Sequence, residues 1–113
     1  MGLEVEINGI SDLPSAVLLT LPTLMNEAGS TMLVSKFKAL SKSGLTQFVV
    51  DLSQTERIGD AALGALNHMK NDQAGQLILL SPCPKVEHLI KTVGLEVPIV
   101  YILGDVQSII KES

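Results

Sequence analysis

Several kinds of residue are scarce or missing in this chain. Of its 113 residues only one is a cysteine, Cys83, and the aromatic residues are Phe37, Phe48 and Tyr101, with no Trp. A single cysteine excludes an intrachain disulfide and favours a reducing compartment. So few aromatic side chains provide no platform on which nucleic-acid bases could stack, and the core must be built from Val, Leu, Ile and Met.

Basic residues and long apolar runs are also lacking. Eight Lys and Arg residues stand against 12 Asp and Glu, giving a net charge of −4, which argues against binding to a phosphate backbone. No apolar run is long enough to span a bilayer, and Met1–Glu6 lacks the features of a signal peptide. The apolar fraction of 46% excludes a disordered chain. We therefore predict one soluble, cytoplasmic domain over residues 1–113.

The residue patterns that carry catalysis are missing as well. His68 and His88 have no second ligand at metal-binding spacing, and Ser53 and Ser81 lie in no nucleophile motif. Cys83 has no identified base, and no Gly-rich phosphate loop is present. The sequence therefore predicts a protein that is not an enzyme and that holds no cofactor and no metal.

The N-terminal region is expected to form a β-hairpin. Alternating apolar and charged residues over Leu3–Ile7 predict a half-exposed strand. Asn8 and Gly9, together with residues 11–15, are turn-forming residues. The apolar run Ala16–Leu21 then predicts a second strand, antiparallel to the first.

The rest of the chain alternates helices and strands. Gly44 and Gly94 are placed to end helices in a left-handed conformation, and Pro84 suits a helix start. The order ββαβαβαβα predicts an α/β fold, with a mixed, mostly parallel sheet of about five strands and about four helices. The expected elements are helix 28–43, strand 46–51, helix 61–72, strand 76–81, helix 84–93, strand 98–103 and a terminal helix capped by Asp105.

One stretch is the most informative for function. Phe48–Ser53 has the pattern of a buried strand, and after a polar loop a helix of small residues begins near Asp60. A helix N-terminus carries unpaired N–H groups and a partial positive charge, and an Asp is among the best residues to cap it. Loops held in this way often carry function, so we expect the site at residues 53–60.

A response-regulator receiver is one family that this arrangement brings into consideration. In such a domain an Asp ends a central strand, as Asp51 does here, and a Ser or Thr ends the next strand, as Ser81 does. Phosphoryl transfer to that Asp needs Mg²⁺ held by further carboxylates. Asn8 stands where those carboxylates are expected, and Gly104 where a Lys is expected, so the sequence disfavours this family.

A second resemblance extends in order over about 90 residues. Val49–Ser53 is similar to the strand ending Asp-Leu-Ser of the STAS domain family, the fold of bacterial anti-sigma factor antagonists. Leu63–Leu66 is similar to the Leu-Gly part of the family's Asp-Ser-Ser-Gly-Leu-Gly helix start, in the same register. Gly59 then stands in the place of the family's Asp, and Asp60 in the place of its phosphorylatable Ser. Further matches lie at 75–79, 86–95 and 104–106.

The resemblance implies regulation by partner switching. In the family, the unphosphorylated antagonist binds an anti-sigma factor, usually a serine kinase, and phosphorylation of the Ser ends the complex. Asp60 cannot accept that phosphate, so its fixed charge either mimics the phosphorylated state or serves only as a helix cap. Ser11, Ser53 and Thr55 are either alternative phosphorylation sites or ordinary loop hydroxyls.

We expect the partner to be an anti-sigma factor or a related serine kinase. An alternative is a STAS regulatory subunit that braces the nucleotide-binding subunit of a membrane lipid transporter. A third possibility, weak nucleotide binding, has no supporting motif, and the oligomeric state, monomer or weak homodimer, stays open. The residues expected to bind the partner are Met25, Asn26, Glu27, Ser53, Thr55, Gly59, Asp60, Ala61 and Leu63.

Overall fold

A five-stranded sheet forms the centre of the computed structural model, which describes residues 5–10, 13–72 and 76–112. Its strand order is β1-β2-β4-β6-β7, in which β1 pairs antiparallel with β2 and all other neighbours are parallel. The mixed sheet and its N-terminal antiparallel pair confirm the predicted fold class. The strands are β1 (Glu6–Ile10), β2 (Leu13–Thr20), β4 (Gln47–Asp51), β6 (Gln76–Leu80) and β7 (Ile99–Val100).

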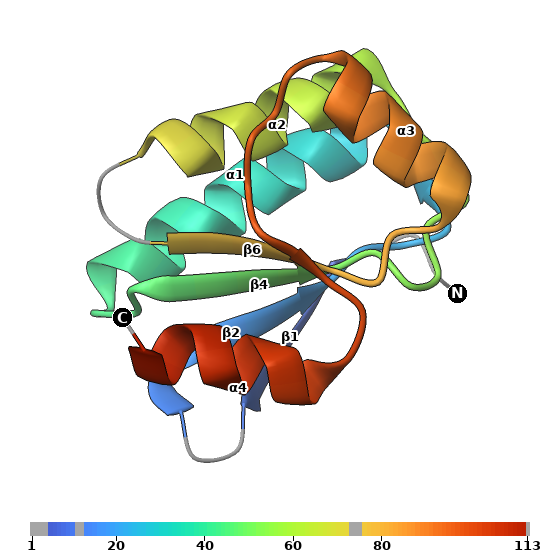
Figure 1. Cartoon of the computed structure of the whole chain (residues 1–113). Coiled ribbons are helices and arrows are strands. Elements are labelled where there is room, and N and C mark those ends of the chain that lie inside the picture. Colours follow the sequence, from blue (N-terminus) through green and yellow to red (C-terminus); the bar gives the residue numbers. More distant parts are fainter. Residues whose placement is uncertain (1–4, 11–12, 73–75, 113) are drawn as a thin grey trace.

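Four helices cover the two faces of this sheet. Helices α1 (Glu27–Lys42), α2 (Asp60–Asn71) and α3 (Pro84–Thr92) lie over one face, and α4 (Leu103–Glu112) lies over the other (Figure 1). Each face has its own apolar core, because successive side chains of a strand point to opposite sides. Phe48 and Val50 of β4 belong to the core under α1–α3, and Val49 belongs to the core under α4.

The hairpin differs from its prediction. Asn8 and Gly9 were expected in a turn but pair with β2 inside β1, with a register shift between Gly9 and Ile10. Pro14 and Ser15 lie within β2 rather than before it. A Pro near the start of a strand is tolerated because a missing donor disturbs the ladder least there. Part of the predicted turn, at residues 11–12, lies outside the described residues, as does the first part of the strand predicted at Leu3–Ile7.

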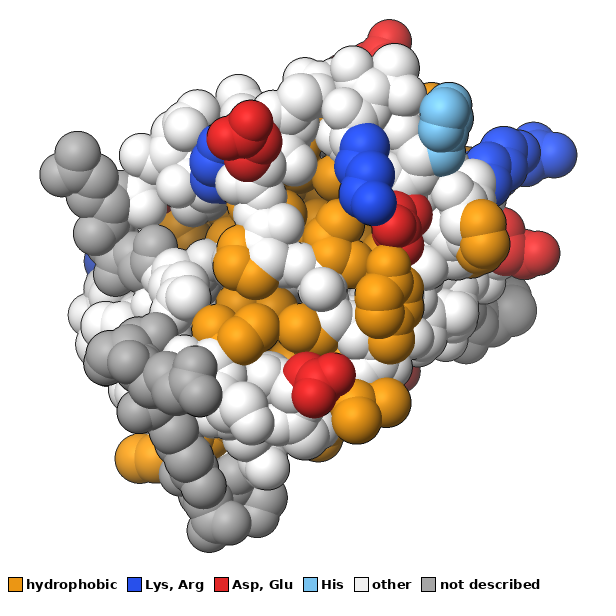
Figure 2. All heavy atoms as spheres, viewed as in Figure 1, with side chains coloured by type: hydrophobic (Ala, Val, Ile, Leu, Met, Phe, Trp, Pro, Cys, Tyr) orange, Lys and Arg blue, Asp and Glu red, His pale blue; other side chains and the backbone are white. Residues whose placement is uncertain are grey.

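The region after β6 also differs. The strand predicted over 98–103 has only two residues, and α4 already begins at Leu103, so Asp105 lies in its first turn rather than capping it. Tyr101, Ile102 and Leu103 are 54%, 62% and 42% exposed, so this apolar run is not a buried strand. Hydrophobic side chains gather on the molecular face that carries this connection (Figure 2). The predicted glycine C-caps are confirmed, with φ of +102° at Gly44 and +76° at Gly94.

Candidate functional site

A small second sheet holds the starts of α1 and α2 next to each other. Strands β3 (Leu24–Met25) and β5 (Arg57–Ile58) pair in parallel. The backbone N–H of Gly59 also donates to the carbonyl oxygen of Met25, at 3.2 Å. The structure therefore brings the segment Met25–Glu27 together with the start of α2. Two-residue strands are too short to show a hydropathy period, so sequence reasoning missed this sheet.

Three of the expected site residues are buried. Met25 is fully buried, Leu63 is 8% exposed, and Thr55 is 1% exposed. The Thr55 hydroxyl donates to the carbonyl oxygen of Pro22 at 3.0 Å, which ties the loop before α2 to the end of β2. Their burial corrects the expectation that Met25, Thr55 and Leu63 contact the partner directly, and the hypothesis that Thr55 is a phosphorylation site.

The remaining expected residues are exposed: Asn26, Glu27, Ser53, Gly59, Asp60 and Ala61. The loop at residues 53–59 is held in place by hydrogen bonds to neighbouring residues. The N–H of Ser53 donates to Asp51 Oδ1 at 2.9 Å, and the Gln54 amide donates to the carbonyl oxygen of Leu21 at 2.9 Å. Asp51 thus fixes the start of the loop. Ser11, the other candidate phosphorylation site named above, lies outside the described residues.

Asp60 does not cap α2, and this prediction was wrong. The N-cap residue is Gly59, whose backbone is extended with φ −92° and ψ 176°, and no side chain bonds to the free N–H groups there. Asp60 is the first helical residue, and its side chain is exposed. A carboxylate in the first turn still interacts favourably with the helix dipole.

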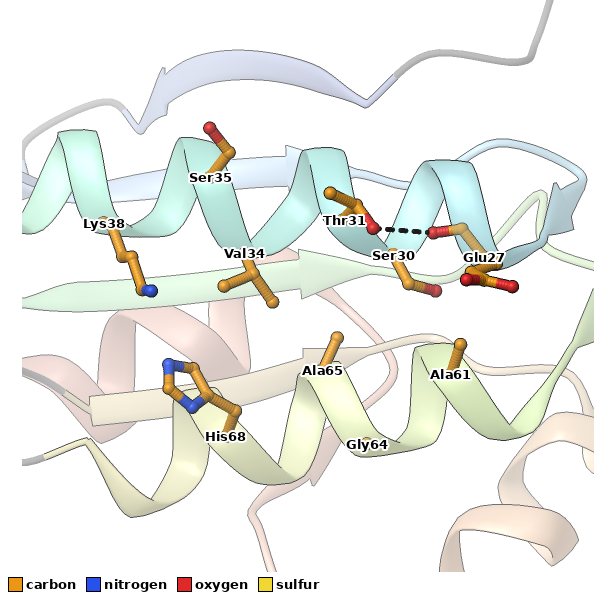
Figure 3. Close-up of a pocket in the computed structure, with 10 residues that line it drawn as sticks. All are labelled: Glu27, Ser30, Thr31, Val34, Ser35, Lys38, Ala61, Gly64, Ala65 and His68. Carbon is orange, nitrogen blue, oxygen red and sulfur yellow. Dashed lines mark hydrogen bonds between the residues drawn. The ribbon is translucent and has the colours of Figure 1, made fainter.

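An open groove of about 570 Å³ lies between α1 and α2, beside these residues (Figure 3). The α1 side runs from Glu27 to Lys38, and the α2 side from Ala61 to His68. Glu27 and Ala61 therefore belong both to the expected site and to the groove. The small residues of α2 at 61, 64 and 65 share one helical face, which is visible in the sequence. The sequence did not reveal the groove itself, because a groove forms only when α1 and α2 pack side by side.

A cluster of polar side chains, Glu87, Lys91 and Tyr101, joins α3 to the β7–α4 connection. The Tyr101 hydroxyl donates to Glu87, and Lys91 Nζ lies 2.9 Å from Glu87 Oε2. The hydrogen bonds from Tyr101 and then from Lys91 lower the pKa of Glu87, and the same bond to Glu87 raises the pKa of Tyr101. Ser81, at the end of β6, has a left-handed backbone with φ +55°.

Two further findings concern metals and membranes. Across residues 5–10, 13–72 and 76–112, no group of three or more His, Cys, Asp or Glu side chains is placed to bind a metal ion. In that part of the chain, no helix is both long enough and apolar enough to cross a membrane.

Solved structures resemble this architecture over nearly its whole length. The TM1081 protein of Thermotoga maritima, a proposed anti-sigma factor antagonist, matches with a TM-score of 0.79 at 18% identity, covering 95% of this chain and 94% of that one. Phosphorylated SpoIIAA of Bacillus matches with a TM-score of 0.75 at 13% identity, covering 94% and 98%. A STAS domain protein of Planctomyces limnophilus matches with a TM-score of 0.72 at 15% identity, covering 91% and 93%.

The fold is the STAS fold. This confirms the fold expected from the resemblance of the sequence. No family model matches the sequence, and neither does any curated protein. The solved neighbours include anti-sigma factor antagonists, and SpoIIAA is known in unphosphorylated and phosphorylated forms. At identities of 13–18% the likeness concerns the fold.

Proposed function

We propose that residues 1–113 form one non-enzymatic, cytoplasmic STAS domain that binds an anti-sigma factor or a related serine kinase. By doing so it regulates sigma-factor-dependent transcription through partner switching. The fold shared with SpoIIAA supports this proposal. The observation that carries it is the exposed acid at the first residue of α2, on a platform that the β3–β5 pair holds beside the start of α1.

The proposed partner face consists of the exposed residues Asn26, Glu27, Ser53, Gly59, Asp60 and Ala61, supported from below by Met25, Thr55 and Leu63. Gly59 and Ala61 are small, so a partner's backbone can approach closely at the centre of this face. Asp60 places one permanent negative charge there. A helix N-terminus tolerates such a charge, as it tolerates a phosphate.

Asp60 acts in this proposal as a built-in mimic of the phosphorylated state. A charged group at the centre of an interface must lose its hydration when the partner binds, which weakens the complex unless an opposite charge meets it. The charge at Asp60 therefore keeps affinity for the partner low. Because the Asp60 side chain makes no cap hydrogen bond, its removal tests this effect with little change in stability.

The first test is affinity purification from the lysate of the native cell, with the wild-type protein, the Asp60→Ala variant and an Asp105→Ala control. Asp105 is also an exposed acid in the first turn of a helix, but α4 lies on the opposite face of the sheet (Figure 1). We expect mass spectrometry to identify an anti-sigma factor or serine kinase, enriched several-fold with Asp60→Ala and unchanged with Asp105→Ala. Recovery of a transporter ATPase instead, equally by all three proteins, would overturn the proposal in favour of a bracing subunit.

The second test uses the recovered kinase. Asp60→Ser should be phosphorylated at that residue and then released from its partner, whereas the wild-type protein should take up no phosphate at position 60. Intact-mass and peptide mass spectrometry read both results. No phosphate uptake by Asp60→Ser with the recovered kinase and several related kinases would count against Asp60 as the equivalent of the phosphorylatable Ser.

A further inference from the structure

We propose that the groove between α1 and α2 receives a helix of the partner protein. That helix carries a basic residue at one end and an acidic residue about eleven positions away. The proposal rests on the proposed function, because Glu27 and Ala61 belong both to the partner face and to the groove. It adds a stated chemistry for the element that docks there.

The groove has the shape of a seat for a helix. Its two walls run in the same direction, from Glu27 to Lys38 on α1 and from Ala61 to His68 on α2 (Figure 3). Ser30 is buried along its floor, with its hydroxyl donating to the carbonyl oxygen of Asn26 at 2.7 Å. A Cβ added at Gly64 would meet no atom within 4 Å. Small residues along two neighbouring helices let the ridge of a third helix approach closely.

A helix fits this groove better than an extended peptide. The backbone N–H and C=O groups of α1 and α2 are bonded within each helix, so the walls offer an extended peptide no partners for its own backbone. A helix satisfies its backbone internally and presents only side chains. Glu27 and Lys38 are eleven positions apart, which corresponds to about 16 Å, or about three turns of a docked helix.

The charges at the ends of the groove set the direction of the docked helix. Glu27 lies at one end of the groove, and Lys38 and His68 lie at the other. Asp60 directly precedes Ala61, which lines the groove at the Glu27 end. All four side chains are exposed. Within the described part of the chain, neither Glu27 nor Lys38 takes part in a salt bridge. A complementary helix therefore places its basic residue over Glu27 and its acidic residue over Lys38, and the reversed helix meets like charges at both ends.

A helical-peptide library tests this order of charges. Each displayed peptide has about 18 residues, a fixed Ala and Leu face, and random residues near both ends. The library is selected in parallel on the wild-type protein and on the Lys38→Glu variant, whose groove has an acidic residue at both ends. We expect the wild-type protein to prefer peptides with one basic and one acidic end, and Lys38→Glu to prefer peptides with two basic ends, each by about tenfold in affinity.

Blocking the groove provides the second arm. Gly64→Trp places a large side chain at an exposed residue that lines the groove, and Gly64→Ala is the matched control, since its methyl group meets open space. Circular dichroism melts check that both variants are folded. We expect the selected peptides to lose at least about tenfold in affinity for Gly64→Trp and to keep affinity within about twofold for Gly64→Ala.

Several results would overturn the groove proposal: selection of no helical peptide, an affinity that Gly64→Trp leaves unchanged, or a preference for peptide end charges that Lys38→Glu leaves unchanged. If the partner from the lysate remains sensitive to Asp60→Ala but binds Gly64→Trp like wild type, the groove proposal alone has failed. If selected helical peptides bind in the groove but no anti-sigma factor or kinase is recovered, the proposed function has failed and the groove proposal remains supported.

Discussion

Helices α1 and α2 begin side by side on the β3–β5 pair, but the two helix starts are stabilised differently. At α1, the Asn26 side chain accepts a hydrogen bond from the N–H of Gly29 at 2.9 Å. At α2, the N-cap residue is Gly59, and no side chain makes the corresponding bond. A side-chain hydrogen bond therefore caps the start of α1. The start of α2 has no side-chain cap, and the exposed Asp60 carboxylate lies beside its first N–H groups. A cap bond does not account for the acid at Asp60, whose charge is favourable at a helix start and is proposed to act on the partner face.

The largest expected effect comes from the residue on which both helix starts depend. Met25 is fully buried, and its carbonyl oxygen accepts the N–H of Gly59. Met25→Ala should lower the free energy of unfolding by about 3 kcal/mol, because it leaves a cavity between β3 and α1. Urea denaturation measures this change. Leu24→Ala, in the same strand but 44% exposed, is the control and should cost less than about 1 kcal/mol. Equal losses would mean that β3 is not packed as described.

The caps themselves are compared by removing one side chain at each helix start. Asn26→Ala should lower the free energy of unfolding by about 1 kcal/mol, because the N–H of Gly29 loses its acceptor. Asp60→Ala should cost about 0.5 kcal/mol or less, since only an interaction with the helix dipole is lost. Urea denaturation of both variants under the same conditions decides the point. A loss with Asp60→Ala as large as that with Asn26→Ala would show that the carboxylate caps α2 in solution.

A cap can also be added to α2. Gly59→Ser should raise the free energy of unfolding by about 0.5 kcal/mol, through a new side-chain cap and a less flexible unfolded chain. The backbone of Gly59 is extended, and a Cβ there would lie 3.7 Å from the Met25 carbonyl oxygen, an ordinary contact. Gly44→Ser is the control, and it should destabilise the protein because φ at Gly44 is +102°. If Gly59→Ser also destabilises it, the start of α2 has no room for a cap.

Long, strongly patterned elements are what the sequence allows to be predicted. The apolar strands at 47–51 and 76–80 and the spacing of Val86 and Ile90 on α3 required only local patterns. The order of strands and helices then restricted the topology to a mostly parallel sheet. Asp60 was misplaced by one position because Gly and Asp are both good N-cap residues, and a local pattern does not decide between neighbours.

Contacts between distant segments explain what the sequence did not reveal. The burial of Thr55 depends on a hydrogen bond to Pro22, 33 positions earlier in the chain. The β3–β5 pair and the groove likewise arise only when two helix starts are placed next to each other. The site was therefore predictable as a loop beside a helix start, but the division of its residues into a buried support and an exposed face was not.

The smallest expected effect concerns α3, a third helix whose N-cap residue, Cys83, makes no side-chain cap bond. Here Glu87 in the first turn accepts a hydrogen bond from the Tyr101 hydroxyl, and that bond, followed by the one from Lys91, holds the pKa of Glu87 below its usual value. A carboxyl whose pKa is lower in the folded state adds stability at neutral pH, and this stability is lost as the pH falls through the folded-state pKa.

Tyr101→Phe removes this hydrogen bond and keeps the ring. At neutral pH it should lower the Tm by at most a few degrees, because more than half of the Tyr101 side chain is exposed to solvent. The difference from wild type should shrink as the pH falls through the lowered pKa of Glu87. Thermal melts followed by circular dichroism at several pH values measure both effects. A difference that persists unchanged in acid would mean that the Tyr101 hydroxyl stabilises the protein independently of the charge on Glu87, and the first turn of α3 would then gain no stability from that charge.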